Sequence, residues 1–120
     1  MMIILLILLA YTIQSVIACF PTATPGPPSI DPCKQCAKSL ITKGGGTAFD
    51  PDMDSLDPTT GCAIWTLKCT SAVGSATITI NGGAIPPETG APTATIMVAC
   101  DATGTAWTYL SYPVSTLDCS

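Results

Sequence analysis

The sequence predicts an all-β fold, a small disulfide-rich sandwich or meander of about four to five strands. Short segments of alternating apolar and polar residues recur along the second half of the chain. Threonine and other residues that favour strands outnumber the strong helix formers. Six cysteines lie within residues 33–120, mostly at the ends of these segments. A chain of 120 residues has room for one such domain.

The first part of this domain is the least regular. Asp31 and Pro32 form an N-cap and first-turn pair, and apolar residues follow at helical spacing as far as the glycines at 44–46. A short helical turn near residues 32–43 is one interpretation, although 39–42 also fits an edge strand. Residues 44–61 are expected to form a loop.

Four strands are predicted after this loop, at 62–70, 75–81, 93–100 and 106–112. In each of the first three, alternate residues form one apolar face: Ala63, Trp65, Leu67 and Cys69, then Ala76, Ile78 and Ile80, then Ile96, Val98 and Cys100. Within the last of them, Trp107 and Tyr109 fall on one face, and Leu110 and Tyr112 fall on the other. The tetrapeptide DATG at 101–104 fits a type I turn, so the last two strands should form a hairpin. The connection 82–92 is rich in glycine and proline and cannot be a strand throughout.

The N-terminal residues 1–18 are typical of a secretory signal peptide. An apolar run at 2–10 is followed by small residues, Val16 and Ala18, ahead of a cleavage point. The alternatives are a transmembrane helix, for which the run is too interrupted, and a lipoprotein signal cut before Cys19. Residues 19–32 then form a Pro/Thr-rich linker ahead of the six-cysteine domain at 33–120. A secreted, extracellular protein without a membrane segment after cleavage is expected.

Cysteine pairing is the main constraint on the fold. An even set of six in a small secreted domain predicts three disulfides, formed by Cys33, Cys36, Cys62, Cys69, Cys100 and Cys119. A zinc ribbon would need a second CxxC or a histidine pair, and a redox CxxC would need an α/β unit. Neither pattern is present. Cys19 either leaves with the signal peptide or remains as a seventh thiol.

The charged residues argue against several classes of function. The protein has a net charge of −4 and no arginine, and nucleic-acid binding needs positive charge, so we expect no nucleic-acid partner. Without histidine there is no Ser-His or Cys-His nucleophile, and we expect neither an enzyme nor a cofactor. The segment DPDMD at 50–54 has the spacing that opens a calcium loop but lacks that loop's glycine and glutamate. A solvated acidic loop is the simpler interpretation, and no metal site is predicted.

The order of the cysteines and the residues around them fits a known family. A cysteine pair three apart is followed by GCAIWTLKC, a strand ending in Asn81 before glycines, a strand ending VAC, GTAWTY and a terminal cysteine. This order resembles the nematode six-cysteine domain, the C-six domain, over residues 33–119. The resemblance implies an extracellular disulfide-bonded domain of unknown biochemical function. It also implies a bridge between Cys33 and Cys62, because some copies lack the first and third cysteines together.

The other four cysteines allow three pairings. If the first three predicted strands alternate in direction, Cys69 and Cys100 lie at one end and Cys36 lies at the other with Cys119. We therefore expect the bridges Cys69–Cys100 and Cys36–Cys119. This requires the first and third strands to lie in facing sheets, because strands two spacings apart in one sheet are about 10 Å apart, beyond the roughly 7 Å limit for a bridge.

The sequence favours a structural or binding module whose partner is an unknown extracellular protein or matrix ligand. Tyr112 and Leu110 are the aromatic and apolar side chains expected at the surface, whereas an aromatic alternating on a strand usually packs in the core. The alternative is a secreted effector such as a protease inhibitor that presents the proline-rich segment 84–92 as bait.

Overall fold

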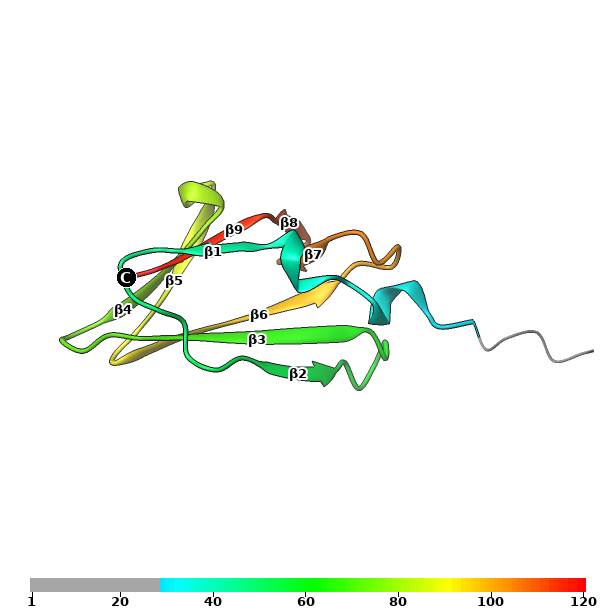
Figure 1. Cartoon of the computed structure of the whole chain (residues 1–120), viewed down its shortest axis with the longest axis horizontal. Coiled ribbons are helices and arrows are strands. Elements are labelled where there is room, and N and C mark those ends of the chain that lie inside the picture. Colours follow the sequence, from blue (N-terminus) through cyan, green and yellow to red (C-terminus); the bar gives the residue numbers. More distant parts are fainter. Residues whose placement is uncertain (1–28) are drawn as a thin grey trace, which may run out of the picture.

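The computed structural model describes residues 29–120, which form two facing β-sheets (Figure 1). The predicted signal peptide and residues 19–28 of the predicted linker lie outside the described residues. The four-stranded sheet has the order β1 (Thr42–Gly44), β9 (Thr116–Cys119), β4 (Ala76–Ile80) and β5 (Ile85–Gly90). The five-stranded sheet has the order β2 (Met53–Leu56), β3 (Ala63–Thr70), β6 (Thr93–Cys100), β7 (Trp107–Tyr109) and β8 (Tyr112–Val114). The predicted all-β class is therefore confirmed.

Neighbouring strands are antiparallel except β1 and β9, which pair in parallel. The helical segments among the described residues are short 3-10 turns at Pro32–Lys34, Lys38–Leu40 and Asn81–Gly83. No helix in this part of the chain is long and apolar enough to cross a membrane. The first two turns occupy the region where the sequence predicts a short helical turn.

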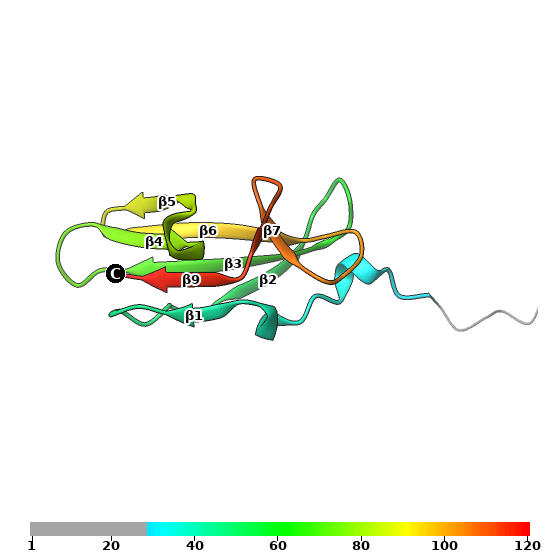
Figure 2. The same ribbon diagram turned by 90° about the horizontal axis from the view of Figure 1, so that it is seen from above.

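The core lies between the two sheets and follows the predicted alternation. Burial alternates residue by residue along β3, β4 and β6, because successive side chains of a strand point to opposite faces. The largest side chains that are almost completely buried come from both sheets: Trp65, Leu67, Ile78, Ile80, Ile96, Leu117 and Val98. Seen from above, β4 and β9 lie over β3 and β6 (Figure 2). The predicted inward faces of these strands are therefore correct.

Residues 29–120 form nine strands, more than the four to five predicted. β2 lies inside the predicted loop 44–61, and β5 lies inside the connection 82–92. Both are edge strands, and β5 contains two prolines, Pro86 and Pro87. All four residues of β2 are exposed, so this strand has no buried apolar face that would appear as an alternating pattern in the sequence.

The predicted strand 106–112 is two strands joined by a tight turn. Leu110 and Ser111 have φ values of 49° and 70°, the left-handed conformation that a two-residue type I′ hairpin requires. Tyr109 pairs directly with Tyr112, so their side chains lie on the same face of the sheet. The predicted placement of Tyr112 opposite Tyr109 is therefore wrong. The predicted hairpin between 93–100 and the next strand is confirmed, with Gly104 N donating to the Asp101 carbonyl oxygen at 3.1 Å.

Three disulfides hold the fold, and the bridge implied between Cys33 and Cys62 is present. The pairing predicted for the other four cysteines is wrong. The structure joins Cys36 to Cys100 and Cys69 to Cys119, each with a Cα–Cα distance of 5.7 Å.

The cause of this error is the strand that the sequence did not reveal. Three alternating strands would give 93–100 the same direction as 62–70, but β5 adds one reversal of the chain. β6 therefore runs antiparallel to β3 and lies next to it in the same sheet. Cys69 is paired with Ala94 near the start of β6, whereas Cys100 lies at the far end of that strand. The Cys69–Cys119 bridge instead joins β3 to β9 of the facing sheet.

Candidate functional site

A groove of about 350 Å³ lies between the N-terminal segment 31–40 and the edge strand β2. Its lining combines apolar and charged side chains from both walls: Lys34, Cys36, Lys38, Asp54, Ser55, Leu56, Ala63 and Trp107. Leu56 contributes an unusually exposed apolar side chain, with 58% of its surface accessible to solvent. We call this feature the β2 groove.

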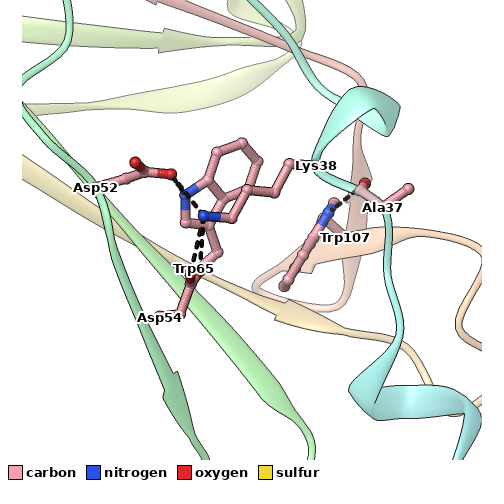
Figure 3. Close-up of polar contacts among 6 residues, drawn as sticks. All are labelled: Ala37, Lys38, Asp52, Asp54, Trp65 and Trp107. Atoms are coloured by element: carbon pink, nitrogen blue, oxygen red, sulfur yellow. Dashed lines mark hydrogen bonds and ion pairs between the residues drawn. The ribbon is translucent and has the colours of Figure 1, made fainter.

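Covalent bonds fix the N-terminal wall of the β2 groove. The Cys33–Cys62 bridge attaches this wall to the residue just before β3, and Cys36–Cys100 attaches it to the end of β6. The indole Nε1 of Trp107 donates a hydrogen bond of 2.9 Å to the Ala37 carbonyl oxygen (Figure 3). These anchors lie within five residues of one another along the wall, so its backbone is held close to the sheet.

An ion-pair cluster includes two residues that line the β2 groove, Lys38 and Asp54. The Lys38 ammonium lies 2.9 Å from a carboxylate oxygen of Asp52 and 2.9 Å from one of Asp54 (Figure 3). It also lies 5.2 Å from the centroid of the Trp65 ring, a favourable cation–π distance. The Trp65 indole Nε1 donates a hydrogen bond to Asp52. Lys38 thus connects the N-terminal wall to β2 and to the core.

The protonation of this cluster follows from its hydrogen bonds. Bonds to Asp54 and Asp52 raise the pKa of Lys38 above its usual value. The Lys38 ammonium, with a smaller contribution from the Trp65 indole, lowers the pKa of Asp52. Lys38 and Asp52 are therefore both charged at neutral pH, so the ion pair is present there.

The four aspartates at 50–57 do not converge on a common point. Asp50 accepts a 2.6 Å bond from the Thr70 hydroxyl, and Asp57 accepts bonds from the backbone N–H groups of Thr59 and Thr60. Only Asp52 and Asp54 meet, and the Lys38 ammonium lies between them. The calcium-loop alternative therefore gains no support from the described residues.

Among residues 29–120, one other cluster brings possible metal ligands together. The ligand atoms of Cys36, Cys100 and Asp101 lie within 4.8 Å of one another. The two sulfurs are bonded to each other in a disulfide, and the Asp101 carboxylate accepts bonds from Thr103, Thr105 and Ala106. The sulfur atoms and the carboxylate of this cluster are therefore already engaged in a covalent bond and in hydrogen bonds.

The predicted aromatic residues divide between core and surface. Trp65 and Trp107 are 1% and 3% exposed, and their ring centroids lie 5.5 Å apart. Leu110 and Tyr112 are exposed, as the sequence predicts. The Tyr109 hydroxyl donates to Glu88, and this bond raises the pKa of Tyr109.

The segment proposed as a protease bait is part of a sheet. Ile85–Gly90 forms β5 and pairs with β4 at the edge of the four-stranded sheet. Glu88 is engaged by Tyr109 from the other sheet. A bait segment would have to be free to extend into a protease, so this geometry does not favour the inhibitor alternative.

The sequence does not predict the β2 groove, because β2 lies within the segment 44–61 that is predicted to be a loop. In the sequence, the aspartates at 50–57 stand out only for their calcium-like spacing. Nothing in the sequence links Lys38 to Asp52, which lies 14 residues away. The one local signal is the CxxC at 33 and 36, which requires the segment beside it to be tethered to the sheet.

A comparison with protein families and with other proteins places this chain. A search of curated proteins and a search of solved structures each gave no significant match. The family described as the C6 domain, a six-cysteine domain, matches residues 36–119, which is more than half of the chain and includes five of the six bridged cysteines. This chain belongs to the C6 domain family.

Proposed function

We propose that this chain is a secreted, non-catalytic binding module, and that the β2 groove is where it binds a partner in the extracellular space. Three disulfides and the C6 domain suggest an extracellular protein, since structural disulfides persist in oxidising compartments. The apolar run at 2–10, followed by Val16 and Ala18, supports export through a signal peptide.

The observation that carries this proposal is a groove with one wall fixed by two disulfides and an exposed apolar side chain, Leu56, on the opposite strand β2. Binding sites are usually concave and largely preformed, with a few polar groups around apolar side chains. The β2 groove has this composition, with Leu56 and Ala63 between charged residues such as Lys34 and Asp54. Its disulfide-bonded wall reduces the conformational entropy that binding would otherwise cost.

A non-catalytic role is supported by the side chains available. The sequence contains no histidine, and the carboxylates nearest the groove, Asp52 and Asp54, are paired with Lys38. Lys38 lowers the pKa of Asp52, whereas a general acid would need a carboxyl group with a raised pKa.

The proposal is tested by changing Leu56, the exposed apolar residue that lines the groove. Immobilised extracellular-matrix and cell-surface preparations would be exposed to labelled wild-type protein and to Leu56→Asp. The matched control is Val73→Asp, which introduces the same charge at a side chain that is 88% exposed in the turn after β3. We expect Leu56→Asp to reduce binding at least tenfold and the control to leave it unchanged. Equal binding by all three proteins would refute the groove as the site.

Secretion is tested separately by N-terminal sequencing of the protein recovered from the culture medium. We expect the mature chain to begin at Cys19 or Phe20, as the predicted cleavage point requires. Retention of the intact N-terminus on cell membranes would contradict it.

A further inference from the structure

The outer edge of β2 has free backbone hydrogen-bonding groups. In an antiparallel ladder, residues alternate between those bonded to the neighbouring strand and those facing away from it. Asp57 N donates to the Cys62 carbonyl oxygen at 2.8 Å, which assigns Ser55 and Met53 to the bonded set. The N–H and C=O groups of Asp54 and Leu56 therefore face away from β3. Within residues 29–120, β3 is the only strand paired with β2.

The same two residues direct their side chains toward the β2 groove. Asp54 is paired with Trp65 and Leu56 with Ala63, so these side chains share the inner face of the sheet. Both line the groove. An extended chain paired with Asp54 and Leu56 would therefore place every second side chain over the groove, because side chains of paired residues lie on the same face.

The charge of this edge selects among possible occupants. Residues 50–57 contain four aspartates and no basic residue. Lys38 is the cation that the structure pairs with two of them. A second copy of the chain joined edge to edge would bring like charges together, which is unfavourable between paired strands. A basic strand would instead gain from the excess of carboxylate.

We propose that the β2 groove binds an extended segment of a partner protein, added to β2 as an antiparallel strand. The segment carries an apolar residue opposite Leu56 and a basic residue opposite Asp54, with one residue between them. Backbone bonds to the two free residues hold the segment, and the two groove-facing side chains give specificity. This inference rests on the proposed function, and it names the chemistry of the partner.

The probe is a blocked seven-residue threonine peptide with leucine third and lysine fifth, which puts both side chains on one face. The control peptide has the same composition with leucine fourth, so that leucine and lysine lie on opposite faces. Both would be titrated into the full mature protein while the backbone amide signals are followed by NMR. We expect the first peptide to shift the amide signals of Asp54 and Leu56 and to slow their hydrogen exchange. The control should bind at least tenfold more weakly.

Two variants separate strand addition from other contacts. Leu56→Pro removes an outward N–H without removing a bond to β3, because edge strands tolerate proline where the N–H faces solvent. Leu56→Ala is its control, since it also loses the leucine side chain but keeps the N–H. Asp54→Asn removes the charge, and Asp118→Asn is its control on β9 of the other sheet. We expect Leu56→Pro to bind the first peptide at least tenfold more weakly than Leu56→Ala does. Asp54→Asn should weaken binding and reduce its salt dependence, and Asp118→Asn should do neither. Amide spectra would establish that each variant is folded.

Several outcomes would overturn this inference. Equal binding of the two peptides, or no binding of either, would show that the edge does not select this pattern. Peptide-induced shifts at the Trp107 indole without any at the Asp54 and Leu56 amides would place a ligand in the groove without strand addition. Concentration-dependent self-association lost in Leu56→Pro would make a second copy the occupant. The comparison of Leu56→Asp with Val73→Asp on extracellular surfaces tests the proposed function independently of these results.

Discussion

Asn81 connects parts of the chain that meet only in the folded state. Its φ of 48° is in the left-handed region, which asparagine tolerates better than most residues. Its side-chain amide donates to the Pro113 carbonyl oxygen at 2.8 Å. Its side-chain oxygen accepts bonds from the backbone N–H groups of Ser115 and Thr116. One side chain therefore fixes the path from β8 into β9.

We predict that Asn81→Ala lowers the free energy of unfolding by about 1–2 kcal/mol, because it removes these bonds and leaves alanine with a left-handed backbone. Chemical denaturation would measure the change. Asn81→Asp is an informative comparison, since it keeps the acceptor for Ser115 and Thr116 but places a carboxylate oxygen against the Pro113 carbonyl oxygen, so it should also be destabilising. Wild-type stability for Asn81→Ala would show that solvent replaces the bonds without loss.

Asp52 makes the stability depend on pH. Because Lys38 lowers the pKa of Asp52 in the folded state, its ionised form stabilises the fold above the usual aspartate range. This contribution is lost as the pH falls from about 4 through the lower pKa of the folded state. Lys38→Gln removes the cause and Asp52→Asn removes the titrating group, so both should flatten the acid limb of a plot of unfolding free energy against pH. An acid limb unchanged in both variants would contradict the assignment.

At the scale of an element, the β7–β8 hairpin combines a demanding turn with residues poorly suited to it. Type I′ turns favour Asn-Gly because both central residues have positive φ, whereas here they are Leu110 and Ser111. Leucine in this conformation costs roughly 1 kcal/mol. The side chain is also exposed, so the fold gains little from burying it in return.

We predict that Leu110→Asn combined with Ser111→Gly raises the free energy of unfolding by about 1 kcal/mol, since it relieves strain at two positions and removes little packing. Thermal and chemical denaturation would measure the gain. Leu110→Ala is the control, because it removes the exposed side chain but keeps a residue with a Cβ in the strained turn, and it should not stabilise. Destabilisation by the double change would show that Leu110 packs against the fold.

For the whole molecule, the Cys69–Cys119 bridge joins the two sheets through the core. Both residues have essentially no exposed surface, and 50 residues separate them in the sequence. Loop-closure entropy assigns such a bridge about 4 kcal/mol. We predict that replacing both cysteines by alanine costs at least this much and lowers the yield of folded protein.

The matched control replaces Cys33 and Cys62 by alanine, which removes a bridge of 29-residue separation at one wall of the β2 groove. This variant should retain the core while hydrogen exchange accelerates in residues 31–40. A map of non-reduced peptides checks the connectivity itself. Recovery of a Cys69–Cys100 linkage would contradict the structure.

The sequence by itself determined the all-β class, the inward faces of β3, β4 and β6, and the six cysteines that form disulfides. These features depend on local sequence or on composition. The alternation of apolar and polar residues within a strand shows which of its faces is buried. The hairpin after β6 was also predictable, since a type I turn depends on four consecutive residues.

Only the tertiary structure decided the strand directions, the disulfide connectivity and the β2 groove. One unrecognised edge strand, β5, reversed the direction of β6 and with it the partners of Cys69 and Cys100. The groove depends on Lys38 reaching Asp52 and Asp54 and on Trp107 reaching Ala37, contacts of 14 to 70 residues in separation. Short edge strands carry too few residues for a pattern, and side chains from distant segments meet only once the sheets have packed.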